Sequence, residues 1–383
     1  MRIVHVVNRL DPEQGGPPRS ALGLCQALAR RGHEVTILTR YLAGFDESDT
    51  AMSGASGGTL RTVVAPSLRA LASEVDSSAD LVQFHSVWQP LTAWVSARCI
   101  REGVPYVIAP RGELDVWSMH QKSLKKFVYL GLLGRRIIAR AGALHLLNEP
   151  ERQGLSKLRL TGNYFLCPNG ADPYEWQGVE SLRGVFRKWL GMEEDAIMLF
   201  FFSRLHHKKG VHLLASAFER AAQRDPRLHL VLAGPDYGEE AALRNKLGML
   251  TARGRVHFVG MLDGARRLEA MADADIFVLP SYQEGHPRSV IEAALAGKAL
   301  MLSPYCNCPE FEQDDAAEIV PLDEVQWAES ILTLASSETT RQQLSRKAQL
   351  IAAESLTWDA IGRRMERHYD AVRHSSSDLA TLQ

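Results

Sequence analysis

The sequence predicts an α/β protein made of two doubly wound, Rossmann-like domains that face each other across a cleft. Short apolar and β-branched runs alternate with helix-like stretches along the whole chain, as in the βα units that build parallel sheets. The chain has 383 residues, 45% of them hydrophobic and 23% charged, which is enough for two globular cores. The charge is also divided: residues 1–168 carry 20 Lys and Arg against 14 Asp and Glu, whereas residues 169–383 carry 24 against 31.

The first domain is expected over residues 1–168. The loop after its first strand contains Gly15 and Gly16 and leads into a helix expected at 20–31. Adjacent glycines let a backbone approach a ligand closely, and a helix N-terminus offers unpaired N–H groups to an anion, although a simple tight turn fits the same residues. The strands of this half are expected at 2–7, 34–39, 81–85, 106–109, 143–147 and 164–167.

The second domain is expected over residues 169–355, after a cluster of turn-forming residues at 168–173. In doubly wound sheets, ligands bind in the loops at the carboxyl ends of the strands, so these loops are the places to look for a site. The strands of this half are expected at 196–202, 228–233, 256–259, 276–279 and 299–302.

Several classes of protein and site are excluded. The five cysteines are scattered, which indicates a reducing compartment, and Cys306 and Cys308 are too close together for a zinc knuckle, so no metal site is expected. No zinc finger, RNP-like or helix-turn-helix pattern is present, so nucleic acid is not an expected partner. The amino end is typical of a first strand and not of a signal peptide, and no run reaches the length of a membrane span, so we expect a cytoplasmic protein.

Two cations, Arg204 and Lys209, follow the apolar run at 196–202. A guanidinium that bonds two oxygens and an ammonium that acts as a point charge together suit a diphosphate at the end of a strand. A solvated basic loop is the alternative interpretation of the same residues.

Two carboxylates, Glu284 and Glu292, follow the run at 276–279. Pro287 suits the first turn of a helix and Gly297 suits its end, which places Glu292 about one turn into that helix. Both side chains can then point into one pocket, where a carboxylate can accept the hydroxyl hydrogens of a ribose or hexose. A helix with an ordinary acidic residue is the alternative.

Taken together, these motifs resemble those of the family 4 retaining glycosyltransferases, which have the two-domain GT-B fold. The resemblance covers nearly the whole chain, and further matches point to the branch that builds bacterial cell-surface polysaccharide and lipopolysaccharide. The matching segments are Gly15-Gly16, P-N-G-x-D at 168–172, R-x4-K-G at 204–210 and E-x7-E at 284–292, with 85–88, 109–114 and Lys125-Lys126 for the branch.

The resemblance implies a role for each motif residue. Arg204 and Lys209 would bind the donor diphosphate, together with backbone N–H groups near Gly16, and no metal ion or other cofactor would be needed. Glu292 would hold the ribose of the nucleotide. The resemblance also implies that a last helix, over 356–374, crosses back onto the first domain.

Two more residues would face the reacting sugar. Glu284 would line the donor-sugar pocket and His85 would lie beside the sugar. With Arg204 and Lys209 they form the expected catalytic set. Retention is assigned to front-face attack, and an inverted product would instead make His85 a candidate general base.

One segment departs from the family pattern, because His286-Pro287-Arg288 replaces the usual small residues after the first Glu-Gly. A cation in the first turn of a helix opposes the helix dipole unless an anion lies nearby. We therefore expect His286 or Arg288 to contact the donor phosphate or an unusual donor sugar.

A basic stretch at 117–140 has six Lys and Arg and no acidic residue, with aromatic residues and leucines between them. It predicts either a surface for anionic lipid or a packed helix with a solvated basic edge. Arg111, Lys122, Lys125 and Lys126 are the candidates for the acceptor or membrane side.

The expected function is transfer of a sugar from a nucleotide diphosphate to a glycan or polyprenyl-linked acceptor, with retention, in a protein that is cytoplasmic or peripheral on the inner face of the cell membrane. Two alternatives share the diphosphate site. One is a GT-B sugar-nucleotide epimerase or hydrolase, and the other is a catalytically silent nucleotide-sugar-binding protein.

Overall fold

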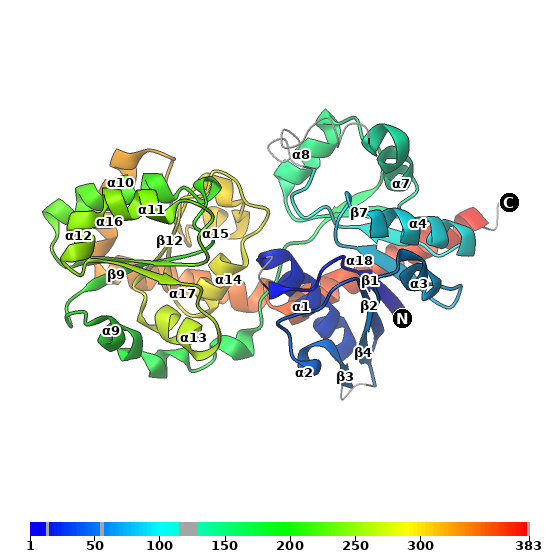
Figure 1. The fold of residues 1–383 in the computed structure, drawn as a ribbon, viewed down its shortest axis with the longest axis horizontal. Helices are drawn as coiled ribbons and strands as arrows, with labels where there is room; N and C mark the ends of the chain where they lie inside the picture. The colour runs from blue at the N-terminus through cyan, green and yellow to red at the C-terminus, as the bar shows by residue number, and fades with distance from the viewer. Residues whose placement is uncertain (13–14, 54–56, 115–128, 381–383) are drawn as a thin grey trace. The chain divides into compact units, whose positions relative to one another are not determined.

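The chain forms two compact units in the computed structural model, which describes residues 1–12, 15–53, 57–114 and 129–380 (Figure 1). Unit 1 comprises Met1–Gly170 together with Trp358–Gln383, and unit 2 comprises Ala171–Thr357. Each unit has its own sheet and its own buried apolar core. The first unit is therefore discontinuous in sequence.

Unit 1 contains an eight-stranded sheet of order β3-β4-β2-β1-β5-β6-β7-β8, in which only the short β3 is antiparallel to its neighbour. The strand order reverses between β1 and β5, which pair in parallel. The sequence-based strands are all present, and β3 and β4 are additional. The strands are β1 (Arg2–Val6), β2 (Glu34–Thr39), β3 (Met52–Ser53), β4 (Thr59–Val64), β5 (Leu81–Phe84), β6 (Tyr106–Ile108), β7 (Ala143–Leu146) and β8 (Tyr164–Leu166).

The first helix of unit 1 begins earlier than the sequence predicted. It runs over Gly16–Arg30, whereas a start at residue 20 was expected. Proline is accepted in the first turn of a helix because the N–H it lacks has no partner there, so Pro17 and Pro18 form the first turn instead of preceding it. The helices of this unit are α1, α2 (Glu47–Thr50), α3 (Leu68–Ser73), α4 (Pro90–Glu102), the π-helical turn η2 (Leu130–Gly134), α7 (Arg135–Ala139), α8 (Glu149–Lys157) and α18 (Trp358–Ala380).

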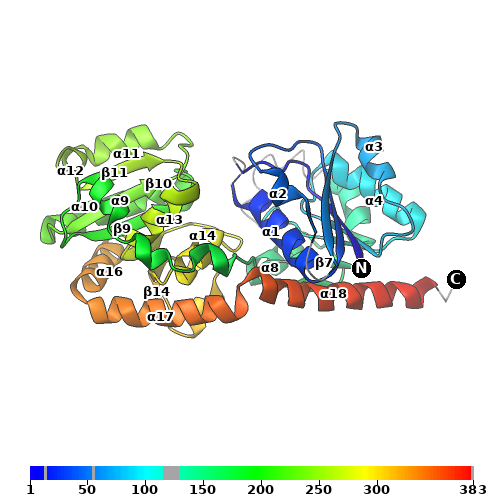
Figure 2. The same cartoon turned by 90° about the horizontal axis from the view of Figure 1, so that it is seen from below.

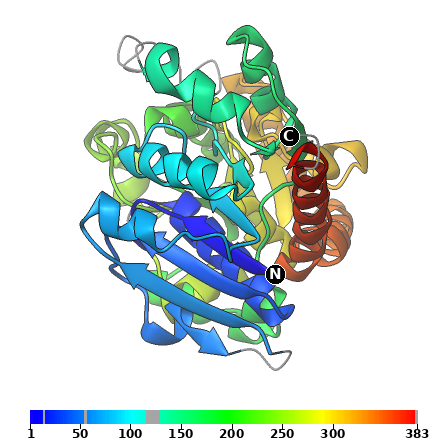
Figure 3. The ribbon, with the colours of Figure 1, turned by 90° about the vertical axis from the view of Figure 1, so that its right-hand side faces the viewer.

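The last helix, α18, completes the core of unit 1 by packing on α1 (Figure 2). A Cβ atom placed on Gly23 of α1 would lie 2.3 Å from Nε1 of Trp358, so only glycine leaves room for that indole. Further along, Tyr369 is fully buried and its hydroxyl donates to Gln83 of β5. The end-on view of Figure 3 shows α18, in red, beside the blue strands of the sheet. The first and last segments of the chain thus share one core.

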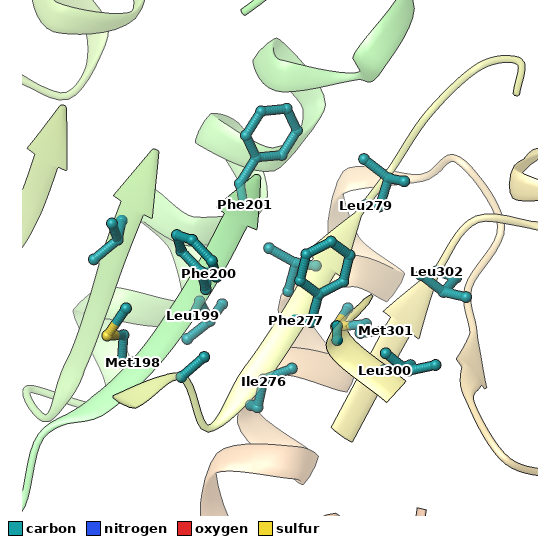
Figure 4. Packing of buried hydrophobic residues seen from close by; sticks show 14 of the residues in the cluster. Met198, Leu199, Phe200, Phe201, Ile276, Phe277, Leu279, Leu300, Met301 and Leu302 are labelled. Carbon is teal, nitrogen blue, oxygen red and sulfur yellow. The ribbon is translucent and has the colours of Figure 1, made fainter. Parts of the chain in front are cut away.

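Unit 2 contains a six-stranded parallel sheet of order β11-β10-β9-β12-β13-β14. Its central strands are almost entirely apolar because both faces are covered (Figure 4). Phe200 of β9 meets Phe277 of β12 edge to face, with ring centroids 6.4 Å apart. The strands are β9 (Ile197–Phe202), β10 (Leu228–Ala233), β11 (Val256–Gly260), β12 (Ile276–Leu279), β13 (Ala299–Leu302) and β14 (Glu318–Ile319).

Helices cover both faces of the unit 2 sheet (Figure 1). None of the helices in the described ranges combines the length and the apolar character needed to cross a bilayer. The α-helices are α9 (Val185–Leu190), α10 (Val211–Arg224), α11 (Glu240–Lys246), α12 (Gly248–Ala252), α13 (Gly264–Asp273), α14 (Arg288–Leu295), α15 (Pro309–Gln313), α16 (Glu324–Ser336) and α17 (Glu338–Ser355), and the 3₁₀ helices are η3 (Pro173–Trp176), η4 (Val179–Leu182), η5 (His207–Lys209) and η6 (Pro304–Cys306).

Candidate active site

The candidate site of unit 2 lies where the strand order of its sheet reverses. The chain places β9, β10 and β11 on one side and then returns to place β12, β13 and β14 on the other, so the reversal lies between β9 and β12. Ligands of open parallel sheets bind at the carboxyl ends of the strands at such a point. Lys209 follows β9 and Glu284 follows β12, and Lys209 Nζ lies 2.5 Å from Glu284 Oε1.

The Glu284 carboxylate and its backbone are held by several hydrogen bonds. Ser281 Oγ donates to the same oxygen as Lys209, at 2.6 Å, while Asn307 Nδ2 donates to the Glu284 carbonyl at 2.6 Å. The Glu284 N–H donates to the carbonyl of Tyr305. Burial raises the pKa of Glu284, but the charge and hydrogen bond of Lys209 and the bond from Ser281 outweigh it, so the pKa lies below its ordinary value. Glu284 is therefore a fixed, ionised carboxylate.

Gly210 brings the loop after β9 directly against the loop after β12. Its φ of 69° is in the left-handed region, and an added Cβ would lie only 2.0 Å from the carbonyl oxygen of Pro280. Position 210 therefore requires glycine, because a larger residue would force apart the two loops that carry Lys209 and Glu284.

Arg204 supplies a second cation at the same edge of the sheet. Its half-buried guanidinium carbon lies 5.2 Å from the centroid of the Tyr237 ring, which follows β10 and is 46% exposed. No carboxylate in the part of the chain that the structure describes pairs with Arg204. Its charge is therefore available to an anion.

Glu292 lies in α14 and has partners different from those of Glu284. Its Oε1 accepts NH2 of Arg288 at 2.6 Å and lies 3.3 Å from NH1 of Arg267. All three side chains are at least 85% buried. The sequence predicted a contact between Arg288 and the donor. In the structure, the Arg288 side chain bonds Glu292.

His286 is buried under the loop that carries it. Its side chain is 1% exposed, and its Nε2 lies 3.4 Å from Oε2 of Glu310 in α15.

In unit 1, His85 follows β5 at the point where that sheet reverses, beside β1. Arg111 NH2 lies 3.1 Å from His85 Nδ1, and His85 Nε2 lies 2.9 Å from His5 Nδ1. Arginine can only donate, so Nδ1 of His85 is the acceptor and its proton is on Nε2, from which it is donated to His5. Burial, followed by the charge of Arg111, holds the pKa of His85 well below its ordinary value. The ring is neutral and both nitrogens are engaged.

Arg111 links His85 to the segment that joins the units. Its NH1 donates to Oδ1 of Asn169 at 2.6 Å, and its backbone φ of 54° is unusual for a residue with a side chain. Burial lowers the pKa of Arg111. Arg111 thus has two neutral hydrogen-bond partners, and the nearby charge of Glu151, which bonds the adjacent Gly112, acts in the opposite direction and raises its pKa.

Gly15 and Gly16 form the N-terminal end of α1, as the anion-binding prediction requires. Gly15 has a φ of 89°, and nothing lies within 4 Å of a Cβ added to Gly16. The following Pro17 and Pro18 have no N–H groups, so this helix end offers fewer donors than an ordinary N-terminus.

Three of the predicted acceptor-side residues, Lys122, Lys125 and Lys126, lie outside the described residues, as does much of the basic stretch at 117–140. Over the described ranges, no group of three or more His, Cys, Asp and Glu side chains is arranged to hold a metal ion.

The site also contains residues that sequence reasoning missed. Ser281, Asn307 and Tyr237 all lie in loops after strands of unit 2, so the rule that selected Arg204 and Glu284 could have indicated them. Arg267 lies within α13 and gave no comparable signal.

Comparisons with known proteins identify the family of the chain. Residues 15–170 match the family described as glycosyl transferase 4-like domain, and residues 184–350 match glycosyl transferases group 1. The chain is a family 4 glycosyltransferase with the GT-B fold. The glycosyltransferase is 23% identical over 97% of its length, and 94% of the relative's, to a phosphatidyl-myo-inositol mannosyltransferase of Mycolicibacterium smegmatis.

Solved structures show the same fold for this glycosyltransferase. Anabaena Alr3699/HepE, in complex with UDP and glucose, matches with a TM-score of 0.76 and 19% identity, over 97% of this chain and all of that one. WaaG, a glycosyltransferase involved in lipopolysaccharide biosynthesis, matches with a TM-score of 0.72 and 16% identity, over 97% of this chain and 99% of that one.

Proposed function

We propose that this glycosyltransferase moves a sugar from a nucleotide diphosphate to a glycan or lipid-linked acceptor, with retention, in the synthesis of cell-surface polysaccharide. The observation that carries the proposal is the pair of Lys209 and Glu284 at the strand reversal of unit 2, with the second cation, Arg204, in the same loop as Lys209. Two cations and one carboxylate suit a ligand that joins a diphosphate to a sugar. The UDP and glucose named for the Anabaena structure support a nucleotide sugar as donor.

The proposed chemistry follows from where charge develops. When the bond between sugar C1 and the diphosphate oxygen breaks, negative charge appears on the leaving diphosphate, where Arg204 and Lys209 stabilise it. The acceptor oxygen forms its bond to C1 on the same face, and its proton passes to the departing diphosphate oxygen. This route needs no protein base. It agrees with His85, whose two ring nitrogens are already engaged.

Arg111 gives unit 1 a positive charge near His85, and we assign this edge to the acceptor. The names of two similar proteins, a phosphatidyl-inositol mannosyltransferase and a lipopolysaccharide enzyme, favour a lipid-linked or glycan acceptor. Lys122, Lys125 and Lys126 belong to the same proposal, together with peripheral binding to an anionic membrane surface. Binding to liposomes that is lost at high salt would support the membrane role, and binding unaffected by anionic lipid content would contradict it.

Product analysis tests the reaction. Incubation with nucleotide sugars and candidate acceptors should give a glycoside whose anomeric configuration, read by NMR, equals that of the donor. Inversion would overturn the proposed mechanism. Consumption of the donor without an acceptor would favour the epimerase or hydrolase, and donor binding without turnover would favour a silent binding protein.

The Lys209→Ala variant tests the residues. Removal of one preorganised cation should lower kcat about 10²–10³-fold, because the leaving diphosphate loses its partner. Lys208→Ala, at the adjacent lysine of η5, is the matched control and should retain most of the activity. Equal activities of the two variants would contradict the role of Lys209.

A further inference from the structure

The carboxylate of Glu292 is held through one of its two oxygens. Oε1 receives both Arg288 NH2, at 2.6 Å, and Arg267 NH1, at 3.3 Å. No donor among the described residues bonds to Oε2. One oxygen is therefore fixed and the other is available to a ligand.

Arg267 is itself held by contacts beyond Glu292. Arg267 also pairs with Glu175, and its guanidinium carbon lies 5.0 Å from the centroid of the Trp176 ring, both in η3. Arg267 and Arg288 carry two positive charges, and Glu175 and Glu292 carry two negative charges. The cluster is thus balanced, so it favours a neutral donor at Oε2 over a charged group.

Helix stability does not explain the pair between Arg288 and Glu292. Arg288 is the first residue of α14, where a cation opposes the helix dipole, and a base placed four residues before an acid is the weaker orientation of such a pair. The arrangement instead fixes the direction of the Glu292 side chain. A hydroxyl hydrogen is the neutral donor that suits its remaining oxygen.

We propose that Arg288 and Arg267 are positioning residues that orient Glu292 toward the ribose hydroxyls of the donor nucleotide. This inference rests on the proposed function, because it assumes that a nucleotide occupies the site. It replaces the expectation that Arg288 contacts the donor phosphate, since the guanidinium is directed to the carboxylate. Arg288 then contributes to affinity only through the sugar hydroxyls.

Calorimetric titration with UDP and with 2′,3′-dideoxy-UDP tests the inference, with GDP and its dideoxy form used where UDP does not bind. The wild-type protein should bind the dideoxy nucleotide about tenfold or more weakly, because hydrogen bonds to the carboxylate are lost. The ratio of the two dissociation constants, that of the dideoxy nucleotide over that of the normal one, should fall toward one in Arg288→Ala. The affinity for the dideoxy nucleotide itself should change little. Arg288→Lys, which keeps the charge, should restore part of the ratio.

Further variants keep the outcomes distinct. Arg267→Ala should also lower the ratio, and Arg266→Ala, at the neighbouring arginine that pairs with Glu269, should not. Thermal unfolding of each variant identifies a loss of folding. An unchanged ratio in folded Arg288→Ala would overturn the inference. So would an equal loss of affinity for both diphosphates that is absent with UMP, because that result indicates a contact between Arg288 and the diphosphate. Failure of the wild-type protein to bind any nucleoside diphosphate would instead overturn the proposed function, and the inference with it.

Discussion

His85 shows how one side chain acquires its chemical state from its neighbours. Arg111 must donate to Nδ1, so the proton of the neutral ring is on Nε2 and is shared with His5. A general base needs a free, basic nitrogen, and this histidine has neither. In this arrangement the His85 ring bonds both Arg111 and His5 and does not accept a proton.

This state has a pH signature. The pKa of His85 is lowered by burial and by the charge of Arg111, so the ring should remain neutral from pH 8 to pH 5, where an ordinary histidine gains a proton. Because the unfolded chain takes up that proton below its ordinary pKa, His85 contributes stability above about pH 6.5 that is lost as the pH falls.

Histidine NMR with ¹⁵N labelling measures both the charge and the tautomer, and the His85→Gln spectrum provides the assignment. We expect an Nε2–H resonance that does not titrate between pH 8 and pH 5. A midpoint near 6.5 would contradict the assigned bonds.

Part of the site was predictable because motif and strand end coincide. Arg204, Lys209 and Glu284 follow predicted strands directly, so a rule about carboxyl ends placed them together before the fold was known. Arg267 was not predictable, since it reaches Glu292 from a different helix and no local spacing links the two. The buried position of His286 was also missed, because its partner Glu310 lies in another helix.

At the scale of elements, the contact between α1 and α18 depends on small residues. Trp358 packs on Gly23 of α1 and on Gly170, where an added Cβ would lie 2.8 Å from the indole. Charged residues support the edge of the contact, since Arg31 and His33 both bond Glu366. The sequence predicted α18. It did not predict that α1 begins at Gly16, because the two prolines in its first turn resemble a turn that precedes a helix.

Gly23→Ala should therefore destabilise unit 1. The new methyl group would lie 2.3 Å from Trp358 Nε1, and overpacking of this kind costs about 1–3 kcal/mol. The midpoint of urea unfolding measures the change. Gly131→Ala is the matched control, because nothing lies within 4 Å of its Cβ, and an equal loss in both variants would refute the packing argument.

At the scale of the whole molecule, the two units differ in how the chain builds them. Unit 2 is continuous from Ala171 to Thr357, whereas unit 1 needs the last helix to complete its core. The sequence predicted two sheets from alternating runs and a boundary near residue 168, but it did not predict strands β3, β4 and β14. The buried apolar residues that α18 contributes are Trp358, Ile361, Met365, Tyr369 and Val372.

Deletion of residues 358–383 should unfold unit 1 and leave unit 2 folded. Each large apolar side chain that loses its buried place costs about 1.5–3 kcal/mol, and the total is comparable with the 5–15 kcal/mol that stabilises a typical domain. Limited proteolysis with mass spectrometry should show rapid cleavage within 1–170 and protection of 171–357. Deletion of residues 375–383 alone is the control and should leave both units protected.

The discontinuity of unit 1 also fixes an order of events during synthesis. On the ribosome, amino-terminal domains usually fold first. Here the helix that covers Gly23 is made only after the whole of unit 2, so the nascent amino-terminal half keeps the apolar face of α1 exposed until α18 has been synthesised. Chaperones therefore have their longest opportunity to bind at that surface.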